Sequence, residues 1–583
     1  MIPAIIKTSP ILMVVAFTLP LAFGIGLTIR SWQATLIRLG PWSALAAVAA
    51  VIGVPTEEAV SFSWLLLKMQ LAIDSTGRLF LLVTSLLWLL SGIYAQGYLA
   101  SDPKRGRFFF FFLLSMAGNF GLIVSQDAVS FYVFFALMSF SSYGLVVHNG
   151  DDAAMKAGRV YIYLVVIGEV LLFTAFVWQA WSVDSLLIKD FSNARPNGII
   201  VGLILIGFGI KAGALPVHVW LPLAHPAAPT PASAVLSGAM IKAGLLGWLR
   251  FLPIGVTALP QWGTLCIVAG LLAAYYAVFV GLTQRNPKTV LAYSSISQMG
   301  LMTVGVGLAL GWPQTVPMML PAIAIYAVHH GFAKGALFLG VGLMAAADSR
   351  RSTYRLAIAG LILASLALAG APFTSGAIAK MALKLPINEF QGFWIDGLKL
   401  LLSAAAVGTT LLMARFLFIV TRPSSAHGQT PIGVWFSWAF TVLLTAATVW
   451  LLPEIRQVAL MTLQPQALWR SLWPVVTGIV VSGSVWLTLI RGKWRPAFSI
   501  PQGDLLIVID TLFRACFGRF RTQQQRMTQF ISHMKKDLWT RRPKFQGISR
   551  LAIRIENRLL NWQTAGLIFI LLMGGLFVLS LNH

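Results

Sequence analysis

Uncharged apolar stretches of roughly 20 residues recur along this sequence and limit its fold more than any other feature. A helix needs about that many apolar residues to cross a bilayer, and continuous runs such as 199–210 lack the alternation of membrane β-strands. We therefore predict an all-α integral membrane protein with about 14–16 transmembrane helices. The expected spans are 11–29, 36–54, 79–99, 108–126, 129–148, 160–181, 198–220, 232–252, 263–283, 289–310, 316–345, 356–384, 397–421, 432–453, 470–490 and 563–581.

Charge is scarce in this chain and mostly basic. Charged residues make up 10% of it, and the formal net charge is +25. In a soluble protein such a charge would favour nucleic acid as a partner, but Lys and Arg also accumulate in the cytoplasmic loops of membrane proteins. The sequence follows the second pattern, because basic residues mark alternate loops of the predicted layout. These residues are Arg30, Arg38, Lys104, Arg105, Arg107, Lys156, Arg159, Arg285, Lys288, Arg350, Arg351 and Arg355. We expect a multi-pass protein of the inner (plasma) membrane. Its partner would be the lipid bilayer, and we expect no binding of nucleic acid.

The predicted spans divide the chain into five segments. N-terminal helices cover 1–100, a central core covers 101–421, and additional helices cover 422–490. The basic segment 491–562 holds fifteen Lys and Arg against four acids and is predicted to be cytoplasmic. Parts of it are amphipathic, so it either lies on the membrane surface, docks on a partner subunit, or forms a loosely ordered loop. The last helix is expected within 563–583.

We find no sequence motif by which this chain would bind a metal or cofactor. Its two cysteines, Cys266 and Cys516, are too few for a disulfide framework or a cysteine-ligated cluster. We find no metal-ligand spacing, and no phosphate loop or dinucleotide fingerprint precedes a helix. We therefore expect no metal or cofactor bound by this chain, so that any redox chemistry would belong to other subunits.

Two predicted helices, the seventh and the twelfth, are interrupted by glycine and proline at 209–216 and 369–372. A break inside a membrane helix is tolerated only where protein or a water-filled cavity satisfies the freed backbone groups. Paired breaks at corresponding places indicate a transporter site between repeats. We predict two inverted five-helix repeats, about 104–252 and 263–421.

Several lysines lie deep inside predicted helices, where a charge is costly and usually functional. Lysines that exchange partners can pass a proton along a row, with histidine as a relay. The alternative is that packing neutralises the lysines and that their role is structural. The candidate residues are Lys211, Lys242, Lys334 and Lys380, with His330 and His329 one turn before Lys334.

One acid, Glu169, lies deep in a predicted helix. A nearby carboxylate stabilises the charged form of a buried lysine, so Glu169 is a candidate partner for the path. Asp127 lies at a helix boundary, where we expect it to contact water.

The sequence around the lysines resembles the antiporter-like subunits of respiratory complex I, Mrp-type Na⁺/H⁺ antiporters and membrane-bound nickel–iron hydrogenases. The runs that carry this resemblance are 211–242, 288–300 and 330–339, and the resemblance extends over about 80–420. The amino-acid sequence at 224–229 and 137–143 is most similar to that of the hydrogenase and formate-hydrogenlyase branch.

This resemblance implies a proton-translocating, non-redox subunit of a multisubunit complex of the NADH:quinone oxidoreductase or hydrogenase type. Other membrane subunits and a peripheral redox module would be its partners and would hold the redox cofactors. By position, the implied proton path consists of Glu169, Lys211, Lys242, His330, Lys334 and Lys380, supported by His218, His225 and His329.

The chain departs from the family pattern at one position. The resemblance places a glutamate in the fifth helix, as partner of the helix-seven lysine, but this chain has Ala136 there. We predict that Glu169 serves Lys211 instead, at a separation of roughly 4–6 Å. Two alternatives stay open: an Mrp-type cation/proton antiporter subunit, and a membrane anchor with impaired transport, which Ala136 favours.

The charge asymmetry predicts that both termini are extracytoplasmic and that 491–562 is cytoplasmic. A cysteine added after His583 should react with a membrane-impermeant thiol reagent applied to intact cells. A cysteine in the basic loop 101–107 is the matched control and should react only after permeabilisation. Labelling of the C-terminal cysteine from the cytoplasmic side alone would contradict this topology.

Overall fold

The computed structural model describes residues 2–506, apart from 57, 196, 347–351, 390–392, 423–429, 452–454 and 491–499. The chain divides into two compact units, Met1–Gln502 and Gly503–His583. In the second unit only Gly503–Leu506 is described, and there the Leu506 N–H donates to the Gly503 carbonyl (2.8 Å). The predicted helix 563–581 and most of the basic segment lie outside the described residues. The candidate site lies in the first unit.

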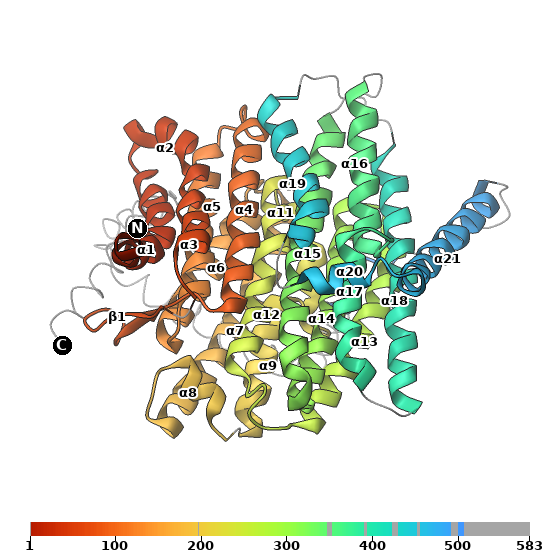
Figure 1. Ribbon diagram of the computed structural model, residues 1–583. Coiled ribbons are helices and arrows are strands. Elements are labelled where there is room, and N and C mark those ends of the chain that lie inside the picture. Colours follow the sequence, from red (N-terminus) through yellow and green to blue (C-terminus); the bar gives the residue numbers. More distant parts are fainter. Residues whose placement is uncertain are drawn as a thin grey trace, which may run out of the picture. The chain divides into compact units, whose positions relative to one another are not determined.

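The described part of the first unit consists of long helices packed side by side and one small β-hairpin (Figure 1). The elements up to the hairpin are α1 Ile2–Gly26, η1 Arg30–Trp32, α2 Gln33–Leu39, η2 Gly40–Ala44, α3 Leu45–Gly53, β1 Val60–Phe62 and β2 Met69–Leu71. Next come α4 Ser75–Tyr98, α5 Arg105–Val124, α6 Ala128–Val146, α7 Asp152–Val183, α8 Ile188–Asn193, α9 Gly198–Ala212, η3 Val217–Trp220, α10 Leu221–Ala227, α11 Thr230–Val235, η4 Leu236–Met240 and α12 Ile241–Phe251. The remainder are α13 Pro260–Thr283, α14 Pro287–Gly311, η5 Pro313–Thr315, α15 Val316–Ala346, α16 Ser352–Ala369, α17 Ser375–Lys384, η6 Leu385–Glu389, α18 Phe393–Val420, α19 Ile432–Leu451, α20 Arg456–Met461 and α21 Pro465–Ile490.

The predicted class, an all-α integral membrane protein, is confirmed. Within the described residues, twelve helices are long and apolar enough to cross a membrane, and Ile11–Gly26 and Ile432–Ala447 are shorter apolar helices. The predicted span 36–54 is present, but it is built from α2, η2 and α3 rather than from one helix. Pro41 lies at the start of η2, where its ring and its missing N–H favour a change of helix geometry. The two inverted repeats stay a prediction.

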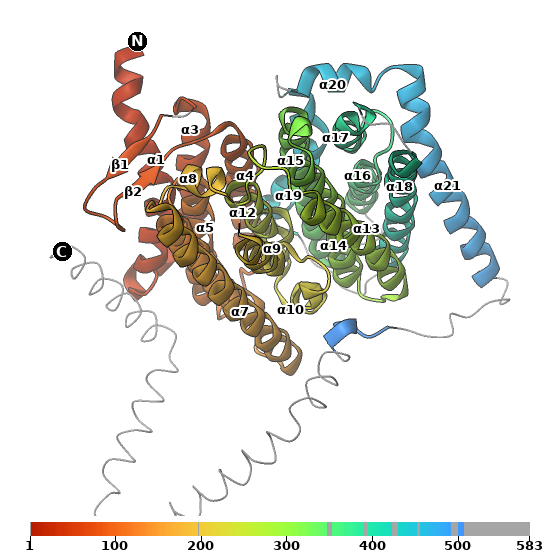
Figure 2. The same ribbon diagram turned by 90° about the horizontal axis from the view of Figure 1, so that it is seen from below.

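Glycines allow the helices α13 and α14 to pack closely (Figure 2). A Cβ atom on Gly270 would lie 2.5 Å from the Gly300 carbonyl oxygen, and a Cβ on Gly300 would lie 2.5 Å from that of Gly270. At a second crossing point, a Cβ on Gly263 would lie 2.6 Å from the Gly307 carbonyl oxygen. Small residues are typical of membrane helix interfaces because apolar lipid supplies no hydrophobic force that drives helices together.

The buried guanidinium of Arg250, near the end of α12, closes the C-terminal end of α5. It donates to the carbonyls of Leu122 (3.1 Å), Ile123 (2.7 Å) and Ser125 (2.9 Å). It also pairs with Asp74, the N-cap of α4, at 3.0 Å. Arg250 therefore satisfies carbonyls that a helix end leaves free and joins three helices.

The expected contact of Asp127 with water is wrong, because its side chain is only 1% exposed. The carboxylate accepts from the Ser130 N–H at the start of α6 (2.8 Å) and from the Gln70 N–H of β2 (2.8 Å). Burial raises the pKa of Asp127, while these two N–H groups act in the opposite direction. The β-hairpin, which sequence patterning did not predict, covers the turn between α5 and α6.

Loops beside several of the basic residues lie on one face of this unit and are joined by hydrogen bonds, directly or through residues 227–228. His148 Nε2 lies 2.9 Å from the carboxylate of Asp102, which joins the α6–α7 loop to the α4–α5 loop. Asn149 (3.1 Å) and Lys288 (2.8 Å) donate to the successive carbonyls at 227–228. We call this the basic face, and it consists of the loops 99–104, 147–151 and 284–286. These loops lie together as predicted, and the compartment that they face stays a prediction.

The close crossing of α13 and α14 predicts a large cost for a single methyl group. Gly270→Ala should lower the free energy of unfolding by about 1–3 kcal/mol, because the carbonyl oxygen of Gly300 leaves no room for a Cβ. Gly397→Ala in α18 is the matched control, since a Cβ there meets nothing within 4 Å among the described residues. It should be neutral, or stabilising by up to about 1 kcal/mol. Thermal unfolding of the purified protein in detergent measures both, and equal melting temperatures would contradict the packing.

Candidate functional site

The predicted break in the seventh helix is confirmed, and it sets the position of Lys211. Helix α9 ends at Ala212, and Gly213 follows with φ +72°, a left-handed conformation that glycine adopts without steric cost. The indole N–H of Trp220 donates to the Ile210 carbonyl (2.7 Å), which at this helix end also accepts the Gly213 N–H (3.3 Å). Lys211 is buried in the last turn of α9.

The ammonium group of Lys211 donates to the hydroxyl of Tyr161 on α7 (3.1 Å). Tyr161 in turn donates to the carbonyl of Ser139 on α6 (2.8 Å), and its ring packs against Trp220 with centroids 5.1 Å apart. Sequence reasoning missed Tyr161, because a tyrosine in an apolar helix has the same pattern as a core residue. Its position seven residues after Ala154, on the buried side of α7, was the available signal.

Glu169 is buried on α7 and interacts electrostatically with Lys211. Gly168 and Gly207 allow α7 and α9 to approach, since a Cβ on Gly168 would lie 3.3 Å from the Gly207 carbonyl oxygen. Neither carboxylate oxygen of Glu169 has a hydrogen-bond partner among the described residues. The charges of Glu169 and Lys211 therefore interact, but the two side chains form no direct hydrogen bond. Their predicted separation of 4–6 Å stays a prediction.

A π-helical turn, η4, positions Lys242 at the start of α12. Lys242 is buried, and its ammonium group donates to the carbonyl of Ser237 inside that turn (2.6 Å). A π-turn interrupts the regular pattern of backbone hydrogen bonds and is frequently found at functional sites. Sequence reasoning identified the lysine, but the turn that supplies its acceptor has no recognisable pattern.

A chain of polar groups leads from Lys242 to Lys334 on α15. The Ser237 hydroxyl lies 2.7 Å from that of Ser295, and Ser295 donates to the Leu291 carbonyl (3.0 Å). Lys334 donates to the same carbonyl (2.8 Å). The two serines lie within the runs that carry the family resemblance, yet sequence reasoning gave them no role.

Two histidines lie beside this series of polar groups. His330 is fully buried and interacts electrostatically with both Lys242 and Lys334. Its two ring nitrogens have no hydrogen-bond partner among the described residues. The His225 ring stacks on Phe338 with centroids 4.5 Å apart and lies within the influence of the same two lysines.

The other two predicted histidines lie outside the connection between Lys242 and Lys334. Nδ1 of His329 pairs with the hydroxyl of Ser375, the first residue of α17 (2.8 Å), and Ser375 donates to the Thr445 carbonyl of α19 (2.6 Å). His218 is buried in η3, with its ring centroid 5.7 Å from that of Tyr276.

The predicted break in the twelfth helix is also confirmed. Helix α16 ends at Ala369, Gly370 follows with φ +87°, and α17 begins at Ser375. The Lys380 ammonium group reaches back to the Ala369 carbonyl at the broken end. One turn later Lys384, which sequence reasoning did not predict, donates to the Ser403 hydroxyl of α18 (2.8 Å).

The chemistry of the site is that of amines, imidazoles, hydroxyls and one carboxylate. Among the described residues no three His, Cys, Asp or Glu side chains converge on a possible metal position. The arrangement can hold and move protons, because each buried lysine has a neighbouring polar acceptor.

Comparisons with known proteins identify the segment that holds these residues. Residues 125–385 match the family model described as NADH:quinone oxidoreductase/Mrp antiporter, TM. Over 343 residues the chain is 33% identical to hydrogenase-4 component B of Escherichia coli, covering 56% of this chain and 50% of that protein. It is 31% identical over 345 residues to a putative antiporter subunit mnhA2 of Staphylococcus epidermidis, covering 54% and 42%. The chain therefore spans about half the length of the curated relatives it matches.

A solved structure supports the fold. The Mrp complex from Dietzia sp. contains a chain that superposes with a TM-score of 0.69 at 21% sequence identity. The match covers 92% of this chain and 63% of that one. The likeness therefore extends to described helices outside the family segment.

The hydrogen bond between Tyr161 and Lys211 predicts a stability difference between two tyrosine variants. Tyr161→Phe should lower the free energy of unfolding by about 1–3 kcal/mol, because the buried ammonium group loses its acceptor. Tyr163→Phe, on the same helix but 66% exposed, is the matched control and should change little. Thermal unfolding in detergent compares them, and equal losses in both variants would mean that the Tyr161 hydroxyl does not hold Lys211.

Proposed function

Because residues 125–385 match the model of the NADH:quinone oxidoreductase/Mrp antiporter family, we propose that this chain is a membrane subunit of that family and translocates protons as the pumping subunit of a redox-driven complex. The observation that carries the proposal is the polar connection between the buried lysines Lys242 and Lys334. A buried charge in a membrane protein is costly and is typical of ion pathways.

Protons would move between the lysines by exchange of partners. A proton released from Lys242 would pass to Lys334 through His330, whose unpaired ring nitrogens lie within the influence of both amines. Reorientation of the Ser295 hydroxyl, which bonds to that of Ser237, would change how the Leu291 carbonyl is shared with Lys334. The Leu291 carbonyl would hold Lys334 in place between transfers.

Lys211 would control the first half of the path. Glu169 supplies the negative charge that the family resemblance places at the position of Ala136, and Tyr161 supplies the nearest acceptor. When Lys211 is attracted toward Glu169, its positive charge would act less strongly on the groups further along the path. Charge at one pair would thereby influence protonation at the next.

Lys380 and Lys384 would form the last part of the path. They lie one helical turn apart on α17, after the second break, and they interact electrostatically. His329 interacts with Lys380 and with Lys242, so it is the candidate link to the preceding part.

Redox energy would come from partners, because the proposed path contains no electron carrier. We propose other membrane subunits and a peripheral redox module, in agreement with the likeness to a hydrogenase-4 component. The likeness to antiporter subunits favours a second candidate, an Mrp-type cation/proton antiporter subunit without redox partners. Purifying the native complex and identifying its subunits distinguishes the two.

Replacing lysines on the path should reduce proton transport without loss of assembly. Lys242→Ala or Lys211→Ala should lower the rate of proton translocation at least about tenfold, because each removes a carrier while neighbouring polar groups remain. Lys156→Ala, an exposed lysine at the start of α7, is the matched control and should leave the rate unchanged. Translocation is measured with a pH-sensitive dye in vesicles that contain the reconstituted complex.

Two results would count against this function. Unchanged translocation in both path variants, in correctly assembled complex, would favour the membrane-anchor alternative. Failure of both variants to assemble would favour a structural role for the lysines.

A further inference from the structure

Three arginines line one cavity at the end of α18. Arg285, Arg415 and Arg422 enclose a volume of about 260 Å³ together with Ile419. Arg285 belongs to the loop between α13 and α14, which is part of the basic face. The other two arginines come from the last turns of α18 and the residues just beyond it. The cavity is therefore built from two segments that are far apart in the sequence.

Contacts with the protein hold two of the guanidinium groups in position. Arg415 is half-buried, and its Nε (3.2 Å) and Nη2 (2.9 Å) donate to the Gln284 carbonyl. The Arg422 guanidinium lies over the Phe418 ring, 4.7 Å from its centroid. These contacts leave several N–H donors on each arginine available to a ligand.

The charged side chains that line the cavity are all positive. The positive charges of Arg285 and Arg422 both act on Arg415. In the described part of Met1–Gln502, no carboxylate forms an ion pair with any of the three. The positive-inside rule requires only that basic residues accumulate in such loops, and dispersed, exposed side chains such as Arg355 fulfil it. Convergence of like charges is instead the arrangement expected around a bound anion.

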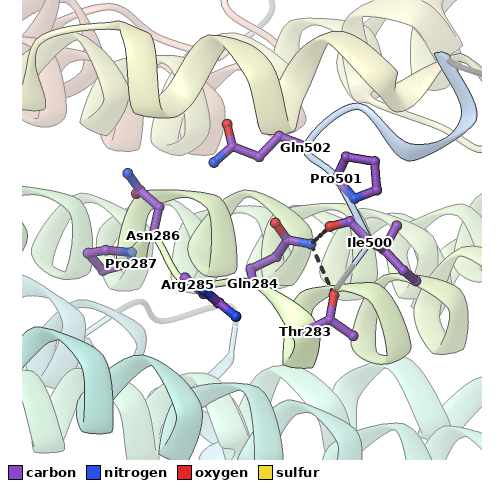
Figure 3. A pocket seen from close by; sticks show the side chains of 8 residues that line it. All are labelled: Thr283, Gln284, Arg285, Asn286, Pro287, Ile500, Pro501 and Gln502. Atoms are coloured by element: carbon purple, nitrogen blue, oxygen red, sulfur yellow. Dashed lines mark hydrogen bonds between the residues drawn. The ribbon is translucent and has the colours of Figure 1, made fainter. Parts of the chain in front are cut away.

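A second cavity, of about 430 Å³, adjoins the first at Arg285 (Figure 3). The segment 500–502 closes one side of it, and the Gln284 side chain donates to the Ile500 carbonyl (3.0 Å). Ile500, Pro501 and Gln502 carry no charge, so this neighbouring wall does not neutralise the arginines.

We propose that Arg285, Arg415 and Arg422 bind the phosphate group of an anionic molecule. Guanidinium groups bind phosphate through paired, charge-assisted hydrogen bonds, and three of them match a group with several acceptor oxygens. Two sources share this chemistry, an anionic phospholipid headgroup and a soluble phosphate. The exposed Phe418 ring and Ile419 on a membrane-spanning helix suit acyl chains beside the phosphate, and basic pockets at the cytoplasmic membrane surface typically bind such headgroups.

Native mass spectrometry of the full-length protein, purified in detergent, tests the site. Phosphatidylglycerol should bind at least about tenfold more tightly than phosphatidylcholine, because the second lipid carries no net charge. The double variant Arg285→Gln/Arg422→Gln should lose that preference. Both side chains are exposed, so the substitutions should leave the fold intact, and Arg415 is kept because it holds the Gln284 carbonyl. Arg355→Gln is the matched control on α16 and should bind like the natural sequence.

A competition arm distinguishes the two sources. Displacement of the bound lipid by inorganic phosphate or glycerol phosphate would support the site and assign it to a soluble anion. Retention of the lipid under the same conditions would support the site and assign it to the headgroup. Equal binding by the natural sequence and the double variant, or no preference for the anionic lipid, would overturn the proposal.

Discussion

A buried ammonium group needs an acceptor, and this requirement links the candidate site to the irregular parts of the helices. Regular helices leave no carbonyl free within their length, so an amine inside a helical bundle has few places to donate. Here Lys242 donates into the π-turn and Lys380 to the carbonyl at the end of α16. Lys211 lies at the end of α9 and uses a tyrosine instead. Lys334 is the exception, because its acceptor, the Leu291 carbonyl, lies within the regular helix α14. For the other three lysines, the interruptions of the helices help to make the burial of charge possible.

The sequence was sufficient to predict most of the helices, the two breaks and the lysines at 211, 242, 334 and 380, because each depends on local patterns. Apolar length predicts a span, a glycine–proline pair predicts an end, and a lone lysine in an apolar run is conspicuous. The acceptors depend on tertiary contacts and could not be predicted in the same way. Tyr161 comes from another helix, Ser237 accepts through its backbone, and Asp127 is covered by a hairpin that is distant in the sequence. Of these, only Tyr161 has a periodic signal, its place on the buried side of α7, and that signal does not reveal its contact with Lys211.

Glu169 illustrates the boundary between the two kinds of inference. Its depth in an apolar helix identified it as unusual, and the absence of an acid at Ala136 suggested what it replaces. Charge interaction with Lys211 fits that idea, while the unpaired carboxylate oxygens show that the two side chains do not form a hydrogen bond. A proton could pass between Glu169 and Lys211 only after a change of rotamer or through an intervening polar group. The pair is therefore better suited to electrostatic control than to carrying the proton itself.

The π-turn also determines how the two parts of its helix are oriented about their common axis. A π-turn contains one more residue than the corresponding α-helical segment, and each residue of an α-helix corresponds to a rotation of about 100°. Because the wide turn accommodates this extra residue, α11 and α12 keep the relative orientation of an uninterrupted α-helix. Loss of a single residue within Leu236–Met240 would restore the regular pattern of backbone hydrogen bonds, so that Lys242 would lose the acceptor at Ser237 while Arg250 stayed at the end of α5. A one-residue deletion in the regular part of α12 would instead rotate the residues after it by about 100°. The π-turn therefore confines the effect of its extra residue to the buried amine and leaves the packing of the N-terminal helices unchanged.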